Sequence, residues 1–437
     1  MKLSCSLFLT LAQAFTLPAL AAVEMVWERL PGHAKDIGLG ADGSAWIIGS
    51  ANRNGIAYRW GGTNWVATDG SGVFIAVGPG GDPWVVDIDS KLRHRMNDQW
   101  VLITEHGSAT EVGVGADGTV LIAGGNSCYC GPVFNQKLYR YDPVLGFILL
   151  TGQGVVIQPD ATGRWVINDQ GELFHAQGDA DYVKIPAHAR DISVAANGAT
   201  WIVGGGAFEA GNDLVYRWNG VQFELATGGT GRRISVGPDG TPWILNANDE
   251  IFRGHFLQLK AQNITVTNGA VLRFPVSLSY PPDRLVSASY QIRDPNAVVV
   301  SSGVVAFSLG ITNVTVNQPT TSSNAVAGPL GTYRLILSNP VGADLGQPEA
   351  SGTVVGTTST PITLVATRGA GGGLVVRCLS QTGFYYLLQR RAEVTGGEGW
   401  LGVVGVAGTG SQIELDDGAP LTGQGFYRVR VTTGSTP

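Results

Sequence analysis

The chain has 437 residues, 63 of which are glycine, and only 14% of its residues are charged. Glycine is costly inside helices, so this composition argues against a helical protein and favours short strands joined by tight turns. The formal net charge of −6 argues against a protein that binds nucleic acid through its phosphates. The length is sufficient for two or three domains.

The first residues are typical of an export signal. Lys2 supplies a positive charge, an apolar stretch runs from Leu7 to Leu20, and Ala19-Leu20-Ala21 fits a small-residue cleavage site. We expect residues 1–22 to be removed and the protein to be secreted, periplasmic or held at the cell surface. A membrane anchor is the alternative, but this apolar run is short for a membrane span, and no later segment is long and apolar enough to be one.

Six similar segments follow, each of which predicts two short apolar strands joined by a tight turn. The first reads DIGLGADGSAWIIG, from Asp36 to Gly49. The first apolar residues of the six segments are Ile37, Ile75, Val112, Val156, Ile192 and Ile234. The intervals between them are 38, 37, 44, 36 and 42 residues, which is a spacing typical of solenoids and propellers. Each repeat continues with a third strand such as AYRW and a fourth such as NWVAT, and four strands per repeat are typical of a propeller blade. We therefore predict a six-bladed β-propeller over residues 23–256.

The sixth repeat lacks a fourth strand before the composition changes at Leu257. A spare strand, VWERLPG, lies before the first repeat from Val26 to Gly32, and its continuation WERLPGHAKDIGLG is similar to DYVKIPAHARDISV later in the chain. We predict that this N-terminal strand completes the last blade and closes the ring, because a closed ring leaves no unpaired sheet edge.

A large apolar residue recurs in the second strand of every repeat. It is tryptophan in five repeats, and Leu121 takes this place in the third. The five tryptophans are Trp46, Trp84, Trp165, Trp201 and Trp243. Packing between blades explains the recurrence, and stacking on a sugar ring is the alternative.

The connection between the second and third strands is long in the first, third and fifth repeats and short in the other three. The true period is therefore a pair of blades, and we predict approximate threefold symmetry with three long polar loops on one face. Loops on a rigid scaffold commonly carry binding residues, and planar amides and carboxylates beside an aromatic ring suit sugar hydroxyls. The candidate ligand-binding residues are Asn52, Arg53 and Asn54 in the first loop, Asn126, Tyr129 and Asn135 in the second, and Glu209, Asn212 and Asp213 in the third. The alternative is that these are solvated loops without a ligand.

The pattern GxDGxxW…YRW…W resembles that of the tectonin family of β-propellers, over roughly Val26 to Phe256. Members of this family include lectins that bind glycans or lipopolysaccharide on bacterial and other surfaces. The resemblance implies a carbohydrate-binding propeller. It assigns no individual binding residue, because the loops of this chain have no clear counterpart in the family pattern.

Two smaller β-sandwich domains are predicted after the propeller. Residues 257–356 resemble a Calx-β domain through the segment from Tyr333 to Gly356, and that family often binds Ca²⁺. The carboxylates are scattered, whereas a hard cation needs several oxygens in one place, so we predict no metal and no cofactor. Residues 362–433 resemble fibronectin type III-like or immunoglobulin-like modules, and Arg428 and Arg430 are expected on a solvent face.

The chain carries no familiar catalytic motif. Its six histidines are dispersed, and His175 and His255 are expected to be structural. Cys128 and Cys130 either close a small ring or stay free, and Cys378 is the third cysteine left after the export signal.

We predict an exported, non-enzymatic lectin-like protein that binds glycans or lipopolysaccharide-like polymers. The alternatives are a protein-interaction platform or adhesin component and, more weakly, a glycosidase- or lyase-like enzyme whose carboxylates meet at the propeller axis.

Overall fold

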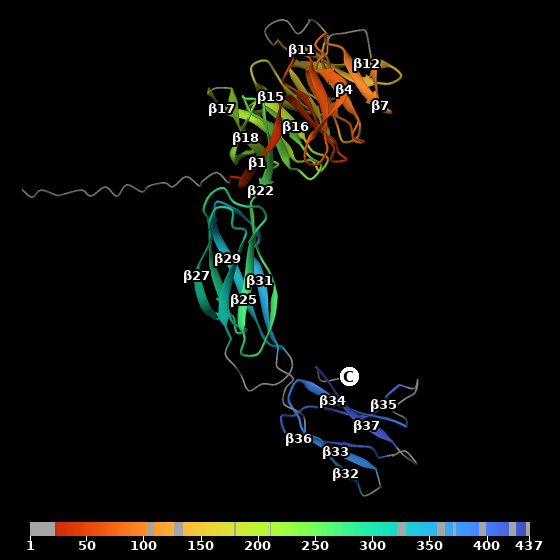
Figure 1. The fold of residues 1–437 in the computed structure, drawn as a ribbon, viewed down its shortest axis with the longest axis vertical. Helices are drawn as coiled ribbons and strands as arrows, with labels where there is room; N and C mark the ends of the chain where they lie inside the picture. The colour runs from red at the N-terminus through yellow and green to blue at the C-terminus, as the bar shows by residue number, and fades with distance from the viewer. Residues whose placement is uncertain are drawn as a thin grey trace, which may run out of the picture. The chain divides into compact units, whose positions relative to one another are not determined.

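The computed structural model describes residues 22–103, 109–125, 134–178, 181–209, 211–320, 329–355, 363–369, 373–392, 399–418 and 425–433. Every regular element in these ranges is a β-strand, so the prediction of an all-β protein is confirmed (Figure 1). The chain divides into two compact parts, Met1–Leu257 and Gln258–Pro437, which we call the N-terminal body and the C-terminal part. The predicted export signal lies outside the described residues except for Ala22.

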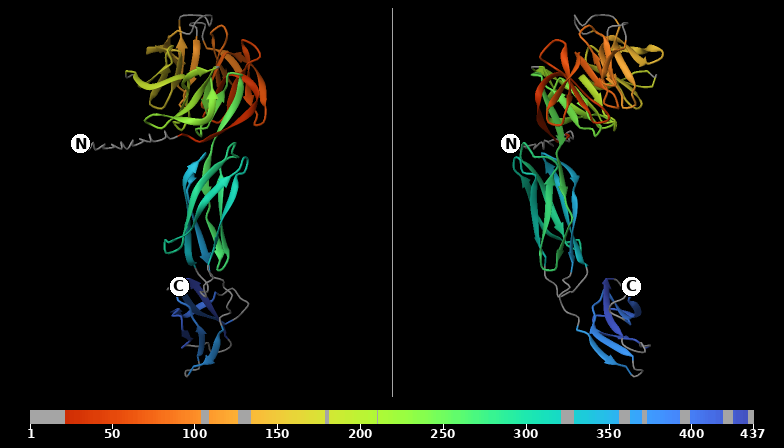
Figure 2. Two further views of the ribbon diagram at one scale, coloured as in Figure 1. Left: turned by 90° about the vertical axis from the view of Figure 1, so that its left-hand side faces the viewer. Right: turned by 45° about the vertical axis from the view of Figure 1, so that its right-hand side comes forward.

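The sequence repeats of the N-terminal body form antiparallel sheets (Figure 2). Two repeats form a four-stranded sheet each, and the other four combine in pairs, through a shared strand, into two sheets of seven strands. The strands of the first three repeats are β1 (Met25–Leu39), β2 (Ala45–Gly49), β3 (Gly55–Trp60), β4 (Trp65–Gly72), β5 (Phe74–Val77), β6 (Pro83–Val86), β7 (Leu92–Met96), β8 (Gln99–Leu102), β9 (Ala109–Val114), β10 (Val120–Gly124), β11 (Gln136–Asp142) and β12 (Gly146–Gly154). Those of the last three are β13 (Val156–Pro159), β14 (Gly163–Ile167), β15 (Glu172–Gln177), β16 (Val183–Val194), β17 (Thr200–Glu209), β18 (Asn212–Trp218), β19 (Phe223–Gly231), β20 (Arg233–Val236), β21 (Pro242–Leu245) and β22 (Glu250–Phe256). Two long strands, β1 and β16, each pass from one sheet into the next.

The N-terminal strand joins the first repeat to the sixth. The first half of β1 pairs with β22, which places Val26 opposite His255 and Leu30 opposite Ile251. Its second half pairs with β2, with Ile37 opposite Ile47. The predicted pairing of the N-terminal strand with the third strand of the sixth repeat is therefore present.

The Asp-Gly turns are explained by their backbone geometry. Gly43 has a φ of +85°, in the left-handed region that glycine adopts without strain. The preceding Asp42 stabilises the turn, because its Oδ1 accepts the backbone N–H of Ser44 at 2.9 Å. The same contact recurs from Asp117 to Thr119 and from Asp239 to Thr241.

The core of the N-terminal body lies between sheets. A separate apolar cluster fills each junction between successive repeats. At one junction, Leu121 and Leu138 of the third repeat pack with Ile157 of the fourth. At another, Ile37 of the first repeat packs with Trp243 of the sixth. The first strands of the repeats contact one another in the order β1, β5, β9, β13, β16, β20 and again β1.

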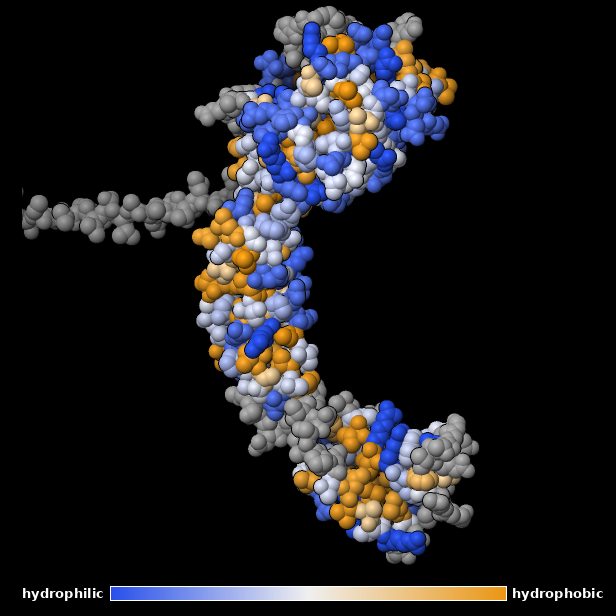
Figure 3. Space-filling view, viewed as in Figure 1, coloured by the Kyte–Doolittle hydropathy of each residue, from blue (hydrophilic) through white to orange (hydrophobic). Residues whose placement is uncertain are grey.

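Residues 258–355 of the C-terminal part form a β-sandwich. One sheet has the order β28-β25-β23-β30 and the other has the order β24-β31-β29-β26-β27. The strands are β23 (Gln258–Ala261), β24 (Ile264–Thr267), β25 (Val271–Leu278), β26 (Val286–Arg293), β27 (Val299–Phe307), β28 (Asn313–Pro319), β29 (Pro329–Val341), β30 (Asp344–Gln347) and β31 (Glu349–Val355). Alternate residues of β25 point inward, so Leu272, Phe274 and Val276 are fully buried. The edge strand β27 exposes Val300 and Val304, and apolar residues gather on this side in Figure 3.

Residues 363–433 form a smaller sandwich of two three-stranded sheets, β32-β33-β36 and β35-β34-β37. The strands are β32 (Val365–Arg368), β33 (Leu374–Leu379), β34 (Phe384–Arg391), β35 (Leu401–Ala407), β36 (Gln412–Asp416) and β37 (Phe426–Thr433). The core combines Val376 and Leu415 of one sheet with Tyr386 and Leu388 of the other. Cys378 is buried in this core, and burial raises the pKa of its thiol.

Candidate functional site

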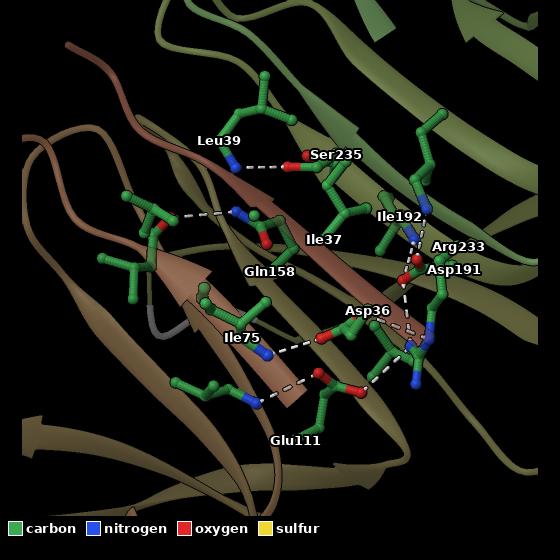
Figure 4. Close-up of a pocket in the computed structure, with 18 of the residues that line it drawn as sticks. Asp36, Ile37, Leu39, Ile75, Glu111, Gln158, Asp191, Ile192, Arg233 and Ser235 are labelled. Carbon is green, nitrogen blue, oxygen red and sulfur yellow. Dashed lines mark hydrogen bonds and ion pairs between the residues drawn. The ribbon is translucent and has the colours of Figure 1, made fainter. Parts of the chain in front are cut away.

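One position in each repeat of the N-terminal body points into a shared central cavity or lies beside it. This position immediately precedes the first apolar residue of the repeat. Its occupants, in chain order, are Asp36, Phe74, Glu111, Val155, Asp191 and Arg233. The first, third and fifth repeats therefore contribute three carboxylates, and the sixth contributes an arginine. We call Asp36, Glu111, Asp191 and Arg233 the axial cluster, and all four line the cavity (Figure 4).

Arg233 lies among the three carboxylates. Its Nη1 is 3.3 Å from Glu111 Oε2 and 3.7 Å from Asp191 Oδ1, and its Nε is 3.6 Å from Asp36 Oδ1. The guanidinium also stacks 4.8 Å from the ring centroid of Phe74. One side chain thus makes ionic contacts to three other repeats.

Two of these carboxylates accept backbone hydrogen bonds from neighbouring repeats. Ile75 N–H donates to Asp36 Oδ2 at 2.6 Å, and Ile234 N–H donates to Asp191 Oδ2 at 2.8 Å. The first strand of each sheet has no further strand on its inner edge, so its backbone donors need side-chain acceptors or water. Asp36 and Asp191 therefore fasten the first strand of one repeat to that of the next.

Burial changes the acidity of the axial cluster. Burial raises the pKa of Asp36 to about 7, although Arg233 acts to lower it. Burial likewise raises the pKa of Glu111 to about 8, and it raises that of Asp191. Three ionised carboxylates would leave a buried excess of negative charge around one arginine, so part of the cluster stays protonated near neutral pH.

The cavity is small, with a volume of about 50 Å³. This is room for a few water molecules, whereas sites for small organic ligands occupy several hundred Å³. In the described residues, no group of three or more His, Cys, Asp or Glu side chains is arranged to hold a metal ion. The axial cluster therefore ties sheets together and does not offer room for a sugar.

The three long loops begin beside the axial cluster. In the first and third repeats the start of the first strand pairs with the end of the second strand, with Ala34 opposite Gly49 and Ala109 opposite Gly124. In the fifth repeat Ala189 lies opposite Gly204, and β17 continues beyond this point to Glu209, which pairs with Asn212 of β18. All three connections lie at the end of the sheet that carries the acidic residue, but the third is a strand extension, so the prediction of a long loop there was wrong. Asn126 and Tyr129 of the second loop lie outside the described residues, and the side chain of Glu209 in β17 is not described either.

Three of the predicted ligand-binding residues make equivalent contacts to the next repeat. Asn54 Oδ1 accepts Ile88 N–H at 3.3 Å, and Asn212 Oδ1 accepts Ala247 N–H at 2.6 Å. Asn135 makes the most complete contact, since its Oδ1 accepts Asp169 N–H at 2.9 Å and its Nδ2 donates to Asp169 Oδ1 at 2.8 Å. These asparagines brace the short turn of the following even-numbered repeat.

The other described candidates divide into buried and exposed residues. Asp213 is only 3% exposed, and its Oδ2 pairs with Arg190 Nε at 2.5 Å. Asn52 and Arg53 are exposed, and their backbone carbonyls accept hydrogen bonds from Lys35 Nζ. Phe134, beside Asn135, exposes 61% of its surface and was not among the sequence candidates. The ligand-binding prediction stays a prediction, with Asn52 and Arg53 as its accessible described side chains.

Asn135→Ala is expected to lower the free energy of unfolding of the N-terminal body by about 1–2 kcal/mol, because it leaves a donor and an acceptor at Asp169 without their partner. Urea titrations followed by tryptophan fluorescence measure this change. Asn64→Ala, in an exposed turn, is the matched control and should change little. Equal stability of the two variants would contradict a bracing role for Asn135.

The recurrent tryptophans are buried at the junctions between sheets. Trp46, Trp84, Trp165, Trp201 and Trp243 expose between 0% and 6% of their surface. The residue opposite this position on the third strand is basic or histidine in every repeat: Arg59, His94, Arg140, His175, Arg217 and Arg253. His94, for example, stacks on Trp84 with 3.9 Å between ring centroids. Packing, and not sugar stacking, accounts for these tryptophans.

The histidines of the even repeats pair with carboxylates at the ends of their sheets. His175 Nε2 lies 2.7 Å from Asp160 Oδ2, and His255 Nε2 lies 2.9 Å from Glu28 Oε2. Partial burial alone would raise the pKa of Asp160, but hydrogen bonds from His175 and Thr162 outweigh burial and lower it. The Glu28 contact adds a hydrogen-bond link between β1 and β22, in agreement with the structural role expected for His255.

No protein-family model and no curated protein matches the chain. Among solved structures, the crystal structure of calcium binding domain CBD12 of CALX1.1 is similar over 36% of this chain and 74% of that chain, with 15% identity and a TM-score of 0.22. Trypsin-activated alpha-2-macroglobulin from Escherichia coli is similar over 89% of this chain and 35% of that chain, with 9% identity and a TM-score of 0.15. The first of these is a Calx-β neighbour of an all-β chain, and at these TM-scores neither carries an argument about function.

None of the described residues forms a helix with the length and apolar character needed to cross a membrane.

Proposed function

We propose that residues 23–257 form a closed six-bladed β-propeller of tectonin type, which serves an exported protein as a non-enzymatic carbohydrate-binding module. The pairing of β1 with β22 and the apolar junction between the first and sixth repeats support the closed ring. The cyclic order of contacts among the first strands supports a single axis at the cavity. A ring of this kind offers a rigid platform for loops.

The observation that carries this proposal is the joint placement of the three long connections, of which the first two are loops and the third is an extension of β17 and β18. All three lie at the end of the odd-numbered sheets that bears the axial carboxylates, and an asparagine braces each against the next repeat. The cavity between the sheets is too small for a sugar, so a glycan would lie across the loops. Asn52 and Arg53 supply donors and an acceptor for hydroxyls, and the exposed ring of Phe134 supplies an apolar surface for a sugar face.

The axial carboxylates support a binding function in preference to a hydrolytic one. Asp36 and Asp191 already accept backbone hydrogen bonds, and Glu111 faces Arg233. A glycosidase needs two carboxyl groups that flank a substrate bond, with room for the sugar between them. The 50 Å³ cavity does not provide that room.

A glycan array that includes lipopolysaccharides tests the proposal with the full-length protein. We expect binding that a free sugar abolishes and that Asn52→Ala/Arg53→Ala weakens about tenfold, since each lost polar contact is worth on the order of 1 kcal/mol. The matched control is Asn64→Ala, in the exposed turn between β3 and β4 at the opposite end of the same sheet. Absence of binding to every glycan, with capture of a protein partner, would overturn the lectin and favour the interaction platform.

A further inference from the structure

The outer face of sheet β35-β34-β37 carries two arginines side by side. Along β37, Tyr427 and Val429 pack into the core, so the alternate residues Arg428 and Arg430 point away from it and are exposed. In register, Arg428 lies opposite Gln389 and Arg430 lies opposite Leu387. Residues two apart on one face of a strand are about 7 Å apart, so the two guanidinium groups occupy successive rows of the sheet.

Arg428 is held in place by its neighbours. Its guanidinium carbon lies 4.3 Å from the ring centroid of Trp400, and its Nε donates to Gln389 Oε1 at 2.8 Å. Arg391 stacks on the same indole at 5.5 Å. These contacts restrict the guanidinium of Arg428, which remains exposed, and a side chain that is already ordered lowers the entropic cost of binding an anion.

Other arginines of this domain have carboxylate partners. Arg377 Nε lies 2.8 Å from Glu414 Oε2, and Arg390 Nη1 lies 2.8 Å from the buried Asp417. No ion pair among the described residues joins Arg428 or Arg430 to a carboxylate. Within the part of this domain that the structure describes, the outer face therefore carries positive charge without an ion-pair partner.

The central strand β34 separates these arginines from the edge strand β35. β35 contains Gly402 and Gly405, and the phenol of Tyr385 lies over Gly405, where an added Cβ would be 2.3 Å from the phenol oxygen. Leu401 of the same strand is exposed and adds apolar surface at this edge of the sheet. Tyr385 and Trp400 add aromatic surface beside the guanidinium groups.

We propose that this face, centred on Arg428 and Arg430 and flanked by Tyr385 and Trp400, binds an acidic polysaccharide. Guanidinium groups bind carboxylates or sulfates through paired N–H donors, and an aromatic surface suits the apolar face of a sugar ring. The net charge of −6 of the whole chain opposes the approach of a densely charged nucleic acid more than that of a sparsely charged polyuronate. This surface is independent of the loops proposed to bind a glycan on the N-terminal body.

Affinity measurements on the full-length protein with alginate, neutral dextran and double-stranded DNA test the proposal. We expect alginate to bind, with an affinity that falls as salt rises, and dextran not to bind. Arg428→Gln/Arg430→Gln should weaken alginate binding by about tenfold or more, because two charge-assisted contacts are lost. Arg377→Gln on the opposite sheet is the matched control and should bind as the wild type does.

Both arginines are exposed, so the double variant should keep its melting temperature, and Arg430→Gln alone provides a milder test if it does not. The proposal is overturned if alginate does not bind or if the double variant binds alginate as tightly as the wild type. DNA binding at least as tight as that of alginate would overturn the assignment to a polysaccharide. Asn64→Ala, in an exposed turn of the N-terminal body that belongs to neither proposed surface, should leave alginate binding unchanged.

Discussion

Replacing Arg233 with methionine is expected to destabilise the N-terminal body by about 3–5 kcal/mol at pH 7, because removing one partner from a buried ionic cluster leaves uncompensated charge. The substitution keeps an unbranched side chain of similar length beside Phe74. It removes the positive charge that faces Asp36, Glu111 and Asp191. Urea titration with tryptophan fluorescence reports on this body, since ten of the eleven tryptophans precede Leu257.

The stability lost in Arg233→Met should be smaller at acidic pH than at pH 7. The pKa values of Asp36 and Glu111 are about 7 and about 8 in the folded protein, against roughly 4 for both side chains in an unfolded chain. The folded state therefore holds more protons between these limits, so this contribution to stability is complete below pH 4 and is lost as the pH rises through 7 and 8. For the wild type we expect the free energy of unfolding to fall by several kcal/mol from pH 5 to pH 9.

Two further variants test whether the loss of stability and its pH dependence come from the axial cluster. Glu111→Gln cannot titrate, so it should reduce the slope of stability against pH. Arg232→Met is the matched control for Arg233→Met, because Arg232 is the preceding residue in the chain and pairs with the partly exposed Asp249. It should cost less than about 1 kcal/mol at every pH. Equal effects of the Arg232 and Arg233 substitutions would argue against a special role for the axial cluster.

Met25→Asp is expected to unfold the N-terminal body at room temperature. Met25 is fully buried in the cluster that contains Trp201 and Ile234, and it lies opposite Phe256 in the pairing of β1 with β22. A carboxylate there would lose its hydration without gaining a cationic partner, which costs several kcal/mol out of a total stability of about 5–15 kcal/mol. Near-ultraviolet circular dichroism should show the loss of fixed tryptophan environments.

His33→Asp is the matched control for Met25→Asp, since it places the same side chain at an exposed position on the same strand. Its effect should stay within about 1 kcal/mol. A Met25→Asp protein with wild-type fluorescence and stability would contradict the view that the N-terminal strand is part of this core.

The strand order was largely predictable from the sequence, because each repeat contains residues that specify its turns. Asp42 and Gly43 specify a tight turn by local chemistry alone, and the alternation of apolar residues specifies which side of each strand is buried. The N-terminal pairing was also predictable, since the sixth repeat lacks a strand that VWERLPG can supply. The turns are encoded locally, whereas the N-terminal pairing follows from comparing the first and last repeats, which are far apart in the sequence.

The axial cluster was not predicted, although a signal for it exists. Aligning the repeats on Ile37 and its equivalents places Asp36, Glu111 and Asp191 at one position of alternate repeats, which is the same period that the loop lengths revealed. The alignment does not give the distances between residues of different repeats, so Arg233 could not be assigned as the partner of these carboxylates. The asparagines were misleading for a related reason, because Asn135 looks like a solvated loop residue until the turn of the next repeat is placed beside it.

The double pairing of β1 has a consequence for the order of folding events during synthesis. Glu28 and Arg253 form an ion pair across the β1–β22 seam and are separated by 225 residues. β1 therefore cannot pair with β22 until almost the entire N-terminal body has been synthesised. Pairing two strands that are so far apart in the sequence has a large entropic cost of loop closure, and it is slow compared with hairpin formation. The newly made chain should thus pass through a long-lived open form, and a chaperone that shields the segment from Met25 to Leu30 would raise the yield of folded protein.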